Sequence, residues 1–171
     1  MNTNFHELIP ADFADSSRVW IYQANRPFTL HEVLQIDELL EDFASHWLSH
    51  GAEVKGFAKV FFGQFIVIMA DEEATGVSGC STDSSVKLIK NIEQDFTVDL
   101  FNRQLLAFNI HERIQLFPLN ELDSVIEKGE LTTETLYFNN TVLTKKEFIW
   151  GWIIPINQSW LATRLTSMLR R

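Results

Sequence analysis

The sequence VKGFAKVFFGQFIVIMAD, at residues 54–71, decides the fold class. It holds two stretches rich in β-branched and aromatic side chains, 54–62 and 65–71, with only Gly63-Gln64 between them. This composition predicts two strands, and glycine at the first of two loop positions is typical of a type II′ hairpin turn. Because a hairpin joins antiparallel neighbours, whereas a doubly wound sheet needs crossovers between parallel strands, the stretch predicts an antiparallel sheet.

The chain before this hairpin predicts one strand and one helix. Residues 18–23 are rich in aromatic and β-branched side chains, which favours a strand. Thr29 and Glu32 have the spacing of a capping box, so we expect a helix to begin at Leu30. Apolar residues then recur at steps of three and four, as on the buried face of a helix, and Gly51 is a suitable stop.

The order of elements after the hairpin completes the fold prediction. A second helix is expected from the segment 78–85 onward, and 105–110 is expected to be a strand. The order strand, helix, strand, strand, helix, strand is that of the α+β, ferredoxin-like βαββαβ fold, with two helices on one face of an antiparallel sheet. We expect a single α+β domain over 1–171, with the core at about 18–117 and a C-terminal hairpin and helix extension at about 118–171.

The extension is expected to contain short elements. Residues 113–117 should form a hairpin with the strand before them, and 135–138 should pair with 141–143 around two asparagines. Residues 145–154 carry both a capping box and an alternation of apolar residues, so helix and strand both remain open there. A final helix is expected after Ser159.

Composition excludes several classes of function. The formal net charge of −9, from 23 acidic and 14 basic side chains, disfavours binding to nucleic acids and to anionic membrane surfaces. The only cysteine forms no internal disulfide and no zinc cluster by itself. The longest apolar run, Phe65 to Ala70, is far shorter than a membrane-spanning helix, and the first residues do not resemble a secretory signal. We therefore expect a cytoplasmic protein.

Three residues of the first predicted helix share one face at metal-ligand spacing, namely Asp42, His46 and His50. Two histidines and a carboxylate are able to bind a divalent metal. A solvated helix face, with histidines at the end that favours positive charge, is the favoured interpretation. We expect no metal and no cofactor.

The segment SGCSTDSS, residues 78–85, is the candidate functional site. It joins a strand to a helix, and backbone N–H groups at a helix N-terminus, together with the helix dipole, hold anions. The same dipole favours the reactive thiolate of a cysteine. We therefore consider Cys80 a candidate catalytic residue. The candidate ligand-binding residues are its neighbours Gly79, Ser81, Thr82, Asp83, Ser84 and Ser85.

Structural roles compete with these functional ones. A free cysteine is among the most commonly buried residues, so Cys80 is also expected as a small core side chain. Asp83 or a neighbouring hydroxyl is expected to cap the helix, which would occupy the donors that an anion needs. Both structural roles are favoured over the functional ones.

Segments spread over nearly the whole chain resemble a family of small bacterial proteins of unknown activity. They are RVWIYQANR at 18–26, SGCSTDSSV at 78–86, FNN at 138–140, WIIP at 152–155 and SWL at 159–161. Members of that family often carry the automatic label "ABC transporter ATPase". The label requires the pattern Gly-x-x-x-x-Gly-Lys-Ser/Thr, whose glycines and lysine cradle phosphates, and this sequence does not contain it.

Two functions are consistent with these observations. The first is a non-catalytic domain that binds a small anion or a protein. The second is a thiol-dependent enzyme that uses Cys80. A homodimer through the aromatic C-terminal region is one expected assembly, although those aromatic side chains are favoured as core residues. They are Phe138, Phe148, Trp150, Trp152 and Trp160.

Overall fold

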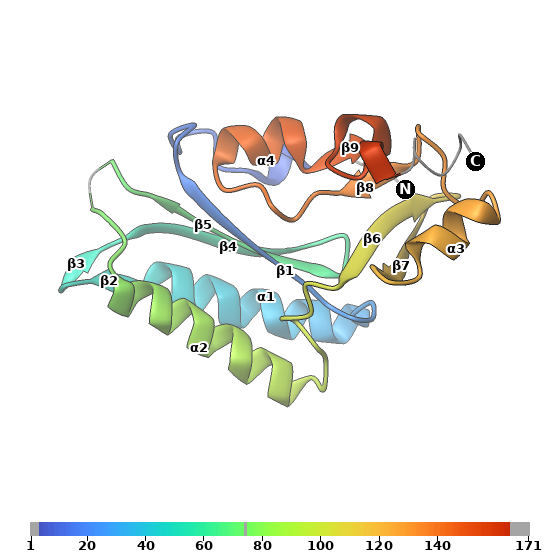
Figure 1. Cartoon of the computed structure of the whole chain (residues 1–171). Coiled ribbons are helices and arrows are strands. Elements are labelled where there is room, and N and C mark those ends of the chain that lie inside the picture. The colour runs from blue at the N-terminus through green and yellow to red at the C-terminus, as the bar shows by residue number, and fades with distance from the viewer. Residues whose placement is uncertain (1–3, 74, 165–171) are drawn as a thin grey trace. The chain divides into compact units, whose positions relative to one another are not determined.

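The computed structural model describes residues 4–73 and 75–164 (Figure 1). The chain divides into two compact units, each of which is described by itself. The N-terminal unit comprises Phe5–Asn102 and Val142–Ile149. The main parts of the C-terminal unit are Arg103–Thr141 and the chain from Trp150 onward. Because this division concerns compactness alone, the single domain expected over 1–171 stays a prediction.

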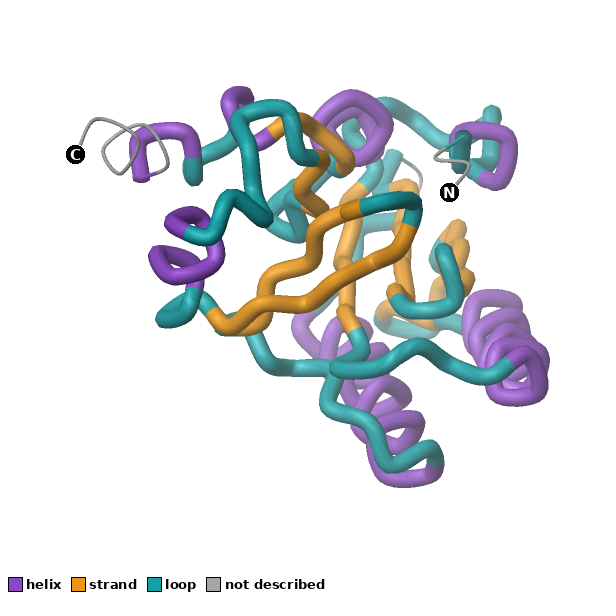
Figure 2. The backbone as a smooth tube through the Cα atoms, turned by 90° about the vertical axis from the view of Figure 1, so that its right-hand side faces the viewer, coloured by secondary structure: helices purple, strands orange, loops and turns teal. Residues whose placement is uncertain are grey.

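The N-terminal unit is built on an antiparallel sheet of three strands in the order β1-β5-β4. The central strand β5 is buried over its whole length, and α1 and α2 lie on the same side of the sheet, as Figures 1 and 2 both show. The strands and long helices are β1 (Arg18–Gln23), α1 (Leu30–Ser45), β4 (Lys55–Phe61), β5 (Phe65–Asp71) and α2 (Gly79–Asp95). The smaller elements are η1 (His6–Leu8), β2 (Leu48–Ser49), β3 (Ala52–Glu53) and the start of α4 (Lys145–Gly151).

The predicted hairpin is confirmed, but its turn differs from the predicted one. β4 and β5 pair in antiparallel register from Lys55 opposite Asp71 to Phe61 opposite Phe65. The φ angles of Phe62 and Gly63 are 53° and 62°. Two successive positive φ angles are the pattern of a type I′ turn, whereas type II′ has only one. Glycine therefore occupies the second turn position and not the first.

The predicted start of α1 is confirmed, and its predicted end is wrong. Thr29 and Glu32 form the capping box in both directions, and the buried side chains of α1 include Ile36 and Leu40. The helix ends at Ser45, several residues before Gly51. Gly51, with φ of 82°, lies in the turn between β2 and β3, so it shapes a hairpin and does not cap the helix.

The ferredoxin-like order is not confirmed. The segment 105–110 does form a strand, β6 (Leu105–Ile110), but it pairs with β7 and β8 in a separate sheet. The outer edge of β1 instead receives the segment at Leu143–Thr144. The N–H group of Val19 donates to the carbonyl of Leu143 at 2.9 Å, and Arg18 forms an isolated antiparallel bridge with Thr144. The coarser prediction is confirmed, because the protein contains both helices and antiparallel sheets.

The C-terminal unit contains a sheet in the order β7-β6-β8-β9. Its core includes Phe108, Leu122, Tyr137, Ile156 and Leu161. Its elements are β6, β7 (Arg113–Pro118), α3 (Leu122–Glu127), β8 (Leu136–Phe138), the end of α4, β9 (Ile153–Pro155) and η2 (Ile156–Gln158).

Three expectations for the extension have different outcomes. Residues 145–154 contain both open alternatives in succession, because α4 ends at Gly151 and β9 begins at Ile153. The expected strand over 141–143 is wrong, since β8 pairs with β6 and β9. Most of the helix expected after Ser159 lies outside the described residues.

Two lysines fix the segment at residues 10–17 in the N-terminal unit. Lys145 is only 6% exposed, and its Nζ donates to the carbonyls of Pro10 and Phe13 at 2.9 and 2.6 Å. Lys55 Nζ lies 3.1 Å from carboxylate oxygens of both Asp12 and Asp71. Burial raises the pKa of Asp71, but hydrogen bonds from Lys55 and from two backbone N–H groups outweigh it, so the pKa of Asp71 is below its usual value.

Replacing Lys145 should therefore destabilise the N-terminal unit. Lys145→Met removes a charged donor and leaves buried carbonyls unpaired, so we expect the free energy of unfolding in urea to fall by about 2–4 kcal/mol. Lys146→Met is the matched control, because Lys146 is the exposed neighbour in the same helix, and it should change stability by less than about 0.5 kcal/mol. Equal effects of the two substitutions would contradict this role of Lys145.

The start of α1 should make stability depend on pH in acid. Hydrogen bonds from Arg26 and from the Thr29 backbone lower the pKa of Glu32 from 4.5 to about 2. The unfolded chain therefore binds more protons in this range, so the contribution of Glu32 is complete above pH 4.5 and is lost as the pH falls towards 2. In Glu32→Gln, which still accepts the cap hydrogen bond, unfolding followed by circular dichroism should show a shallower loss of stability. An unchanged slope would contradict the assignment.

Candidate functional site

The segment at 78–85 forms the first two turns of α2, and its cap is Ser78. The Ser78 side chain accepts from the Ser81 N–H group, and the Ser81 side chain accepts in turn from the Ser78 N–H group. The cap is thus a hydroxyl neighbour of Asp83, one of the two expected possibilities. Asp83 itself is exposed in the second turn.

The hydroxyl groups of this segment bond mainly within the helix. Thr82 Oγ1 donates to the carbonyl of Ser78, and Ser84 Oγ and Ser85 Oγ donate to carbonyls three residues earlier. Ser81 and Ser85 are each 1% exposed, whereas Asp83 and Gly79 are exposed. The predicted ligand-binding residues therefore point to different sides of α2. Serine and threonine in a helix commonly bond their own backbone in this way.

Cys80 is the second residue of α2, and its side chain lies outside the described part of the structure. Its position in the first turn is the one where the helix dipole favours a thiolate. The roles predicted for Cys80 and its neighbours stay predictions.

The histidine face of α1 is not continuous. His46 Nδ1 lies 3.3 Å from Asp42 Oδ1 and 2.9 Å from the Asp42 carbonyl, but His50 lies beyond the helix, in the β2–β3 turn. Within the described ranges, no group of three or more His, Cys, Asp and Glu residues has the geometry of a metal site.

The C-terminal aromatic side chains divide into two groups. Phe138, Phe148 and Trp152 are fully buried, as expected for core residues. Trp150 and Trp160 are 75% and 51% exposed. The homodimer expected through this region stays a prediction.

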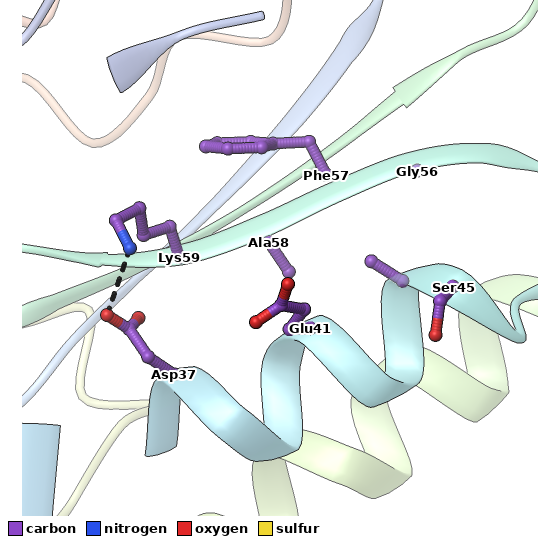
Figure 3. A pocket seen from close by; sticks show the side chains of 8 residues that line it. Asp37, Glu41, Ser45, Gly56, Phe57, Ala58 and Lys59 are labelled. Carbon is purple, nitrogen blue, oxygen red and sulfur yellow. Dashed lines mark hydrogen bonds and ion pairs between the residues drawn. The ribbon is translucent and has the colours of Figure 1, made fainter. Parts of the chain in front are cut away.

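A groove between α1 and β4 has the features of a binding site in the N-terminal unit (Figure 3). Its volume is about 360 Å³, within the range of small ligand sites. One wall is a helix and the other is the edge strand of the sheet, since among the strands of the described residues β4 pairs only with β5. The lining residues are Asp37, Glu41, Ala44, Ser45, Gly56, Phe57, Ala58 and Lys59.

The backbone of β4 directs hydrogen-bonding groups into this groove. The N–H group of Val60 donates to Asp37 Oδ1 at 2.7 Å, so it points away from β5. Residues of an antiparallel strand direct their backbone groups to alternate sides, and Val60, Ala58 and Gly56 therefore share the outward direction. Val60 is satisfied by Asp37, whereas Ala58 and Gly56 face the groove that they line.

The packing of β4 against the end of α1 and against Trp47, which follows the helix, leaves room only for glycine at residue 56. A Cβ atom added there would lie 2.9 Å from Cε3 of the buried Trp47 and 3.4 Å from the carbonyl of Ala44. Glycine keeps the backbone of this edge strand near the helix. The groove thus has a floor of backbone groups and small side chains.

The helix wall is acidic. α1 contains Glu32, Asp37, Glu38, Glu41 and Asp42, and no lysine or arginine. Asp37 Oδ2 is paired with Lys59 Nζ at 3.1 Å, the interaction drawn in Figure 3. The Glu41 side chain projects beside Ala58 in the same view and is exposed. The lining therefore presents one ion pair, between Asp37 and Lys59, and one further exposed carboxylate, that of Glu41.

The sequence contained a signal for this groove that the motif reasoning missed. Gly56 and Ala58 are the small residues of an otherwise bulky strand, and Asp37 and Glu41 are four apart on one face of a helix. Only the pairing order shows that β4 is an edge strand, because pairing is set by residues distant in the sequence.

Comparisons with family models, with curated proteins and with solved structures give no match to this chain. The resemblance to the small bacterial family stays a prediction. Within residues 4–73 and 75–164, none of the helices combines the length and the apolar character that crossing a bilayer requires.

Proposed function

We propose that this protein is a non-catalytic, protein-binding domain that takes an extended, basic segment of a partner along the edge of β4. The observation that carries the proposal is the groove, in which outward-facing backbone groups of Gly56 and Ala58 lie opposite carboxylates of α1. Adding a strand to an exposed sheet edge is a common mode of peptide recognition, in which main-chain hydrogen bonds supply affinity and side chains supply specificity.

Charge favours a basic segment. Asp37 is already paired with Lys59, whereas Glu41 forms no ion pair with any described residue. A lysine or arginine of the partner beside Glu41 would meet an exposed carboxylate. The net charge of −9 supports the same choice, since it attracts basic partners and repels acidic ones.

The pairing surface is short, which limits affinity. Asp37 occupies the N–H group of Val60, so Ala58 and Gly56 remain, each with one donor and one acceptor. A typical hydrogen bond contributes about 0.5–1.5 kcal/mol net. The proposed contact is therefore a weak and reversible one, whose strength depends on the side chains of the partner.

The other functions expected from the sequence remain alternatives to this proposal. A thiol-dependent reaction at Cys80 and an anion site at its neighbours rest on the position of this segment at the start of α2. A ferredoxin-like relationship of the N-terminal unit is supported by the order β1-β5-β4 with two helices on one side, which matches three of the four strands. We also propose a cytoplasmic location, on the basis of composition.

A proline at residue 58 tests the main-chain part of the proposal. The N–H group of Ala58 points away from β5, so Ala58→Pro removes the outward donor at an edge position where proline is tolerated. We expect the affinity for a synthetic peptide of alternating lysine and valine to fall about 3- to 10-fold. The measurement is the shift of backbone amide resonances of ¹⁵N-labelled protein during titration.

Two controls accompany the proline variant. Ala58→Ser keeps the N–H group and should bind within about 2-fold of the unchanged protein. A peptide N-methylated at alternate residues, added to the unchanged protein, should also lose affinity, which covers the case in which the proline disturbs folding. Resonance shifts away from Gly56 and Ala58, or equal binding of the methylated peptide, would rule out strand addition at this edge.

Charge reversal on α1 tests the preference for basic segments. Glu41→Lys should weaken binding of the lysine–valine peptide by about 3- to 10-fold and should improve binding of the corresponding glutamate–valine peptide. Glu38→Lys is the matched control, because Glu38 is exposed on the same helix and does not line the groove. If both reversals weaken binding equally, the effect is one of net charge and the groove is not the site.

A further inference from the structure

A second groove lies within the C-terminal unit and has a different chemistry. Its volume is about 500 Å³, and it lies between the β6–β7 hairpin and the loop from α3 to β8. Its side chains include two amides, two hydroxyls, one imidazole and one carboxylate, with no lysine or arginine. The lining residues are Asn109, Ile110, His111, Gln115, Gly129, Glu130, Thr132 and Thr135.

The turn that carries His111 is unusual among the hairpin turns of this chain. His50-Gly51 and Phe62-Gly63 both have positive φ angles, and both place glycine second, as this turn favours. His111 and Glu112 also have positive φ angles, 49° and 61°, but without a glycine. Non-glycine residues are strained there, and such strain clusters at ligand-binding sites. The preference of this turn for glycine therefore does not explain why His111 and Glu112 occupy it.

Asn109 contributes an unused hydrogen-bond acceptor. Its Oδ1 is buried and has no hydrogen-bond partner among the described residues. Buried polar atoms are rarely left in this state, so each one calls for a donor that completes it. Asn109 also lines the groove, and because its Oδ1 is enclosed, a hydroxyl group of a ligand supplies that donor only after the Asn109 side chain rotates towards the groove.

The opposite wall is held in place before any ligand binds. Gly129, with φ of 74°, follows the C-cap of α3, and the N–H group of Glu130 donates to the Val125 carbonyl at 3.2 Å. Thr135 Oγ1 accepts from the Thr132 N–H group at 2.9 Å, and the Thr135 carbonyl accepts from Ile156. A preformed site loses little conformational entropy on binding.

We propose that this groove binds a small neutral ligand rich in hydroxyl groups, of the size of a mono- or disaccharide. Amides and hydroxyls both donate and accept, which suits sugar hydroxyls. The absence of lysine and arginine from the lining, together with the Glu130 carboxylate, disfavours phosphates and carboxylates. The site lies in the C-terminal unit and is independent of the groove proposed for peptides.

The test is a titration of ¹⁵N-labelled protein with maltose, cellobiose and lactose, with glucose 6-phosphate as the anionic counterpart. We expect saturable shifts of the side-chain amide resonances of Asn109 and Gln115 with at least one disaccharide, and weaker or no shifts with the phosphate. Titration by the phosphate alone, or no shift of these resonances with any disaccharide, would overturn the proposal.

Replacing the two residues of the β6–β7 turn separates an effect on sugar binding from an effect on stability. The double variant His111→Asn with Glu112→Gly installs the residues that this turn prefers, so the thermal midpoint should rise by about 2–5 °C while sugar affinity falls at least about 5-fold. His50→Asn, the same substitution in the β2–β3 turn, should leave sugar binding unchanged. Equal sugar affinity of the turn variant and the unchanged protein would contradict a role for His111 in binding the sugar.

Discussion

The pairing of β5 with both of its neighbours is the constraint on which the N-terminal unit depends. β5 is buried throughout, so each of its backbone groups needs a partner in β1 or β4. This pairing fixes which backbone groups of the two outer strands point outward. On β1 the outward N–H group of Val19 is taken by Leu143. On β4, the Asp37 carboxylate accepts from the outward N–H group of Val60, and Gly56 and Ala58 on the same edge line the groove.

Local features of the fold could be predicted from the sequence, because their causes lie within a few residues. The capping box at Thr29 and Glu32 and the hairpin around Gly63 are of this kind. The strand with which a given strand pairs could not be predicted in this way. Residues 105–110 have the same strand pattern whether they pair with β1 or with β7 and β8, and the choice depends on chain more than 20 residues away in β8.

Glycine is the residue whose meaning the sequence leaves most open. Gly51 follows an amphipathic helix and was expected to end it, but the structure uses it in the tight turn between two short strands. Both uses depend on the same left-handed φ, so the residue type does not distinguish them.

The segment 78–85 shows the same limit for hydroxyl groups. Ser84 and Ser85 donate to carbonyls of their own helix, which the sequence does not specify, and their role towards an anion stays a prediction.

The acidic helix beside β4 also bears on whether the open edge of this strand would pair with a second copy of the chain. An unprotected edge strand is a template for a second copy of the same chain, and charged residues at the edge are a common defence. Here Lys59 lies on the strand, while Asp37 and Glu41 line the groove. A second copy that paired along this edge would bring its own acidic α1 towards this one, and like charges at close range repel. A basic extended segment meets no such repulsion. The same carboxylates thus disfavour a second copy of this chain and favour the basic segment that we propose.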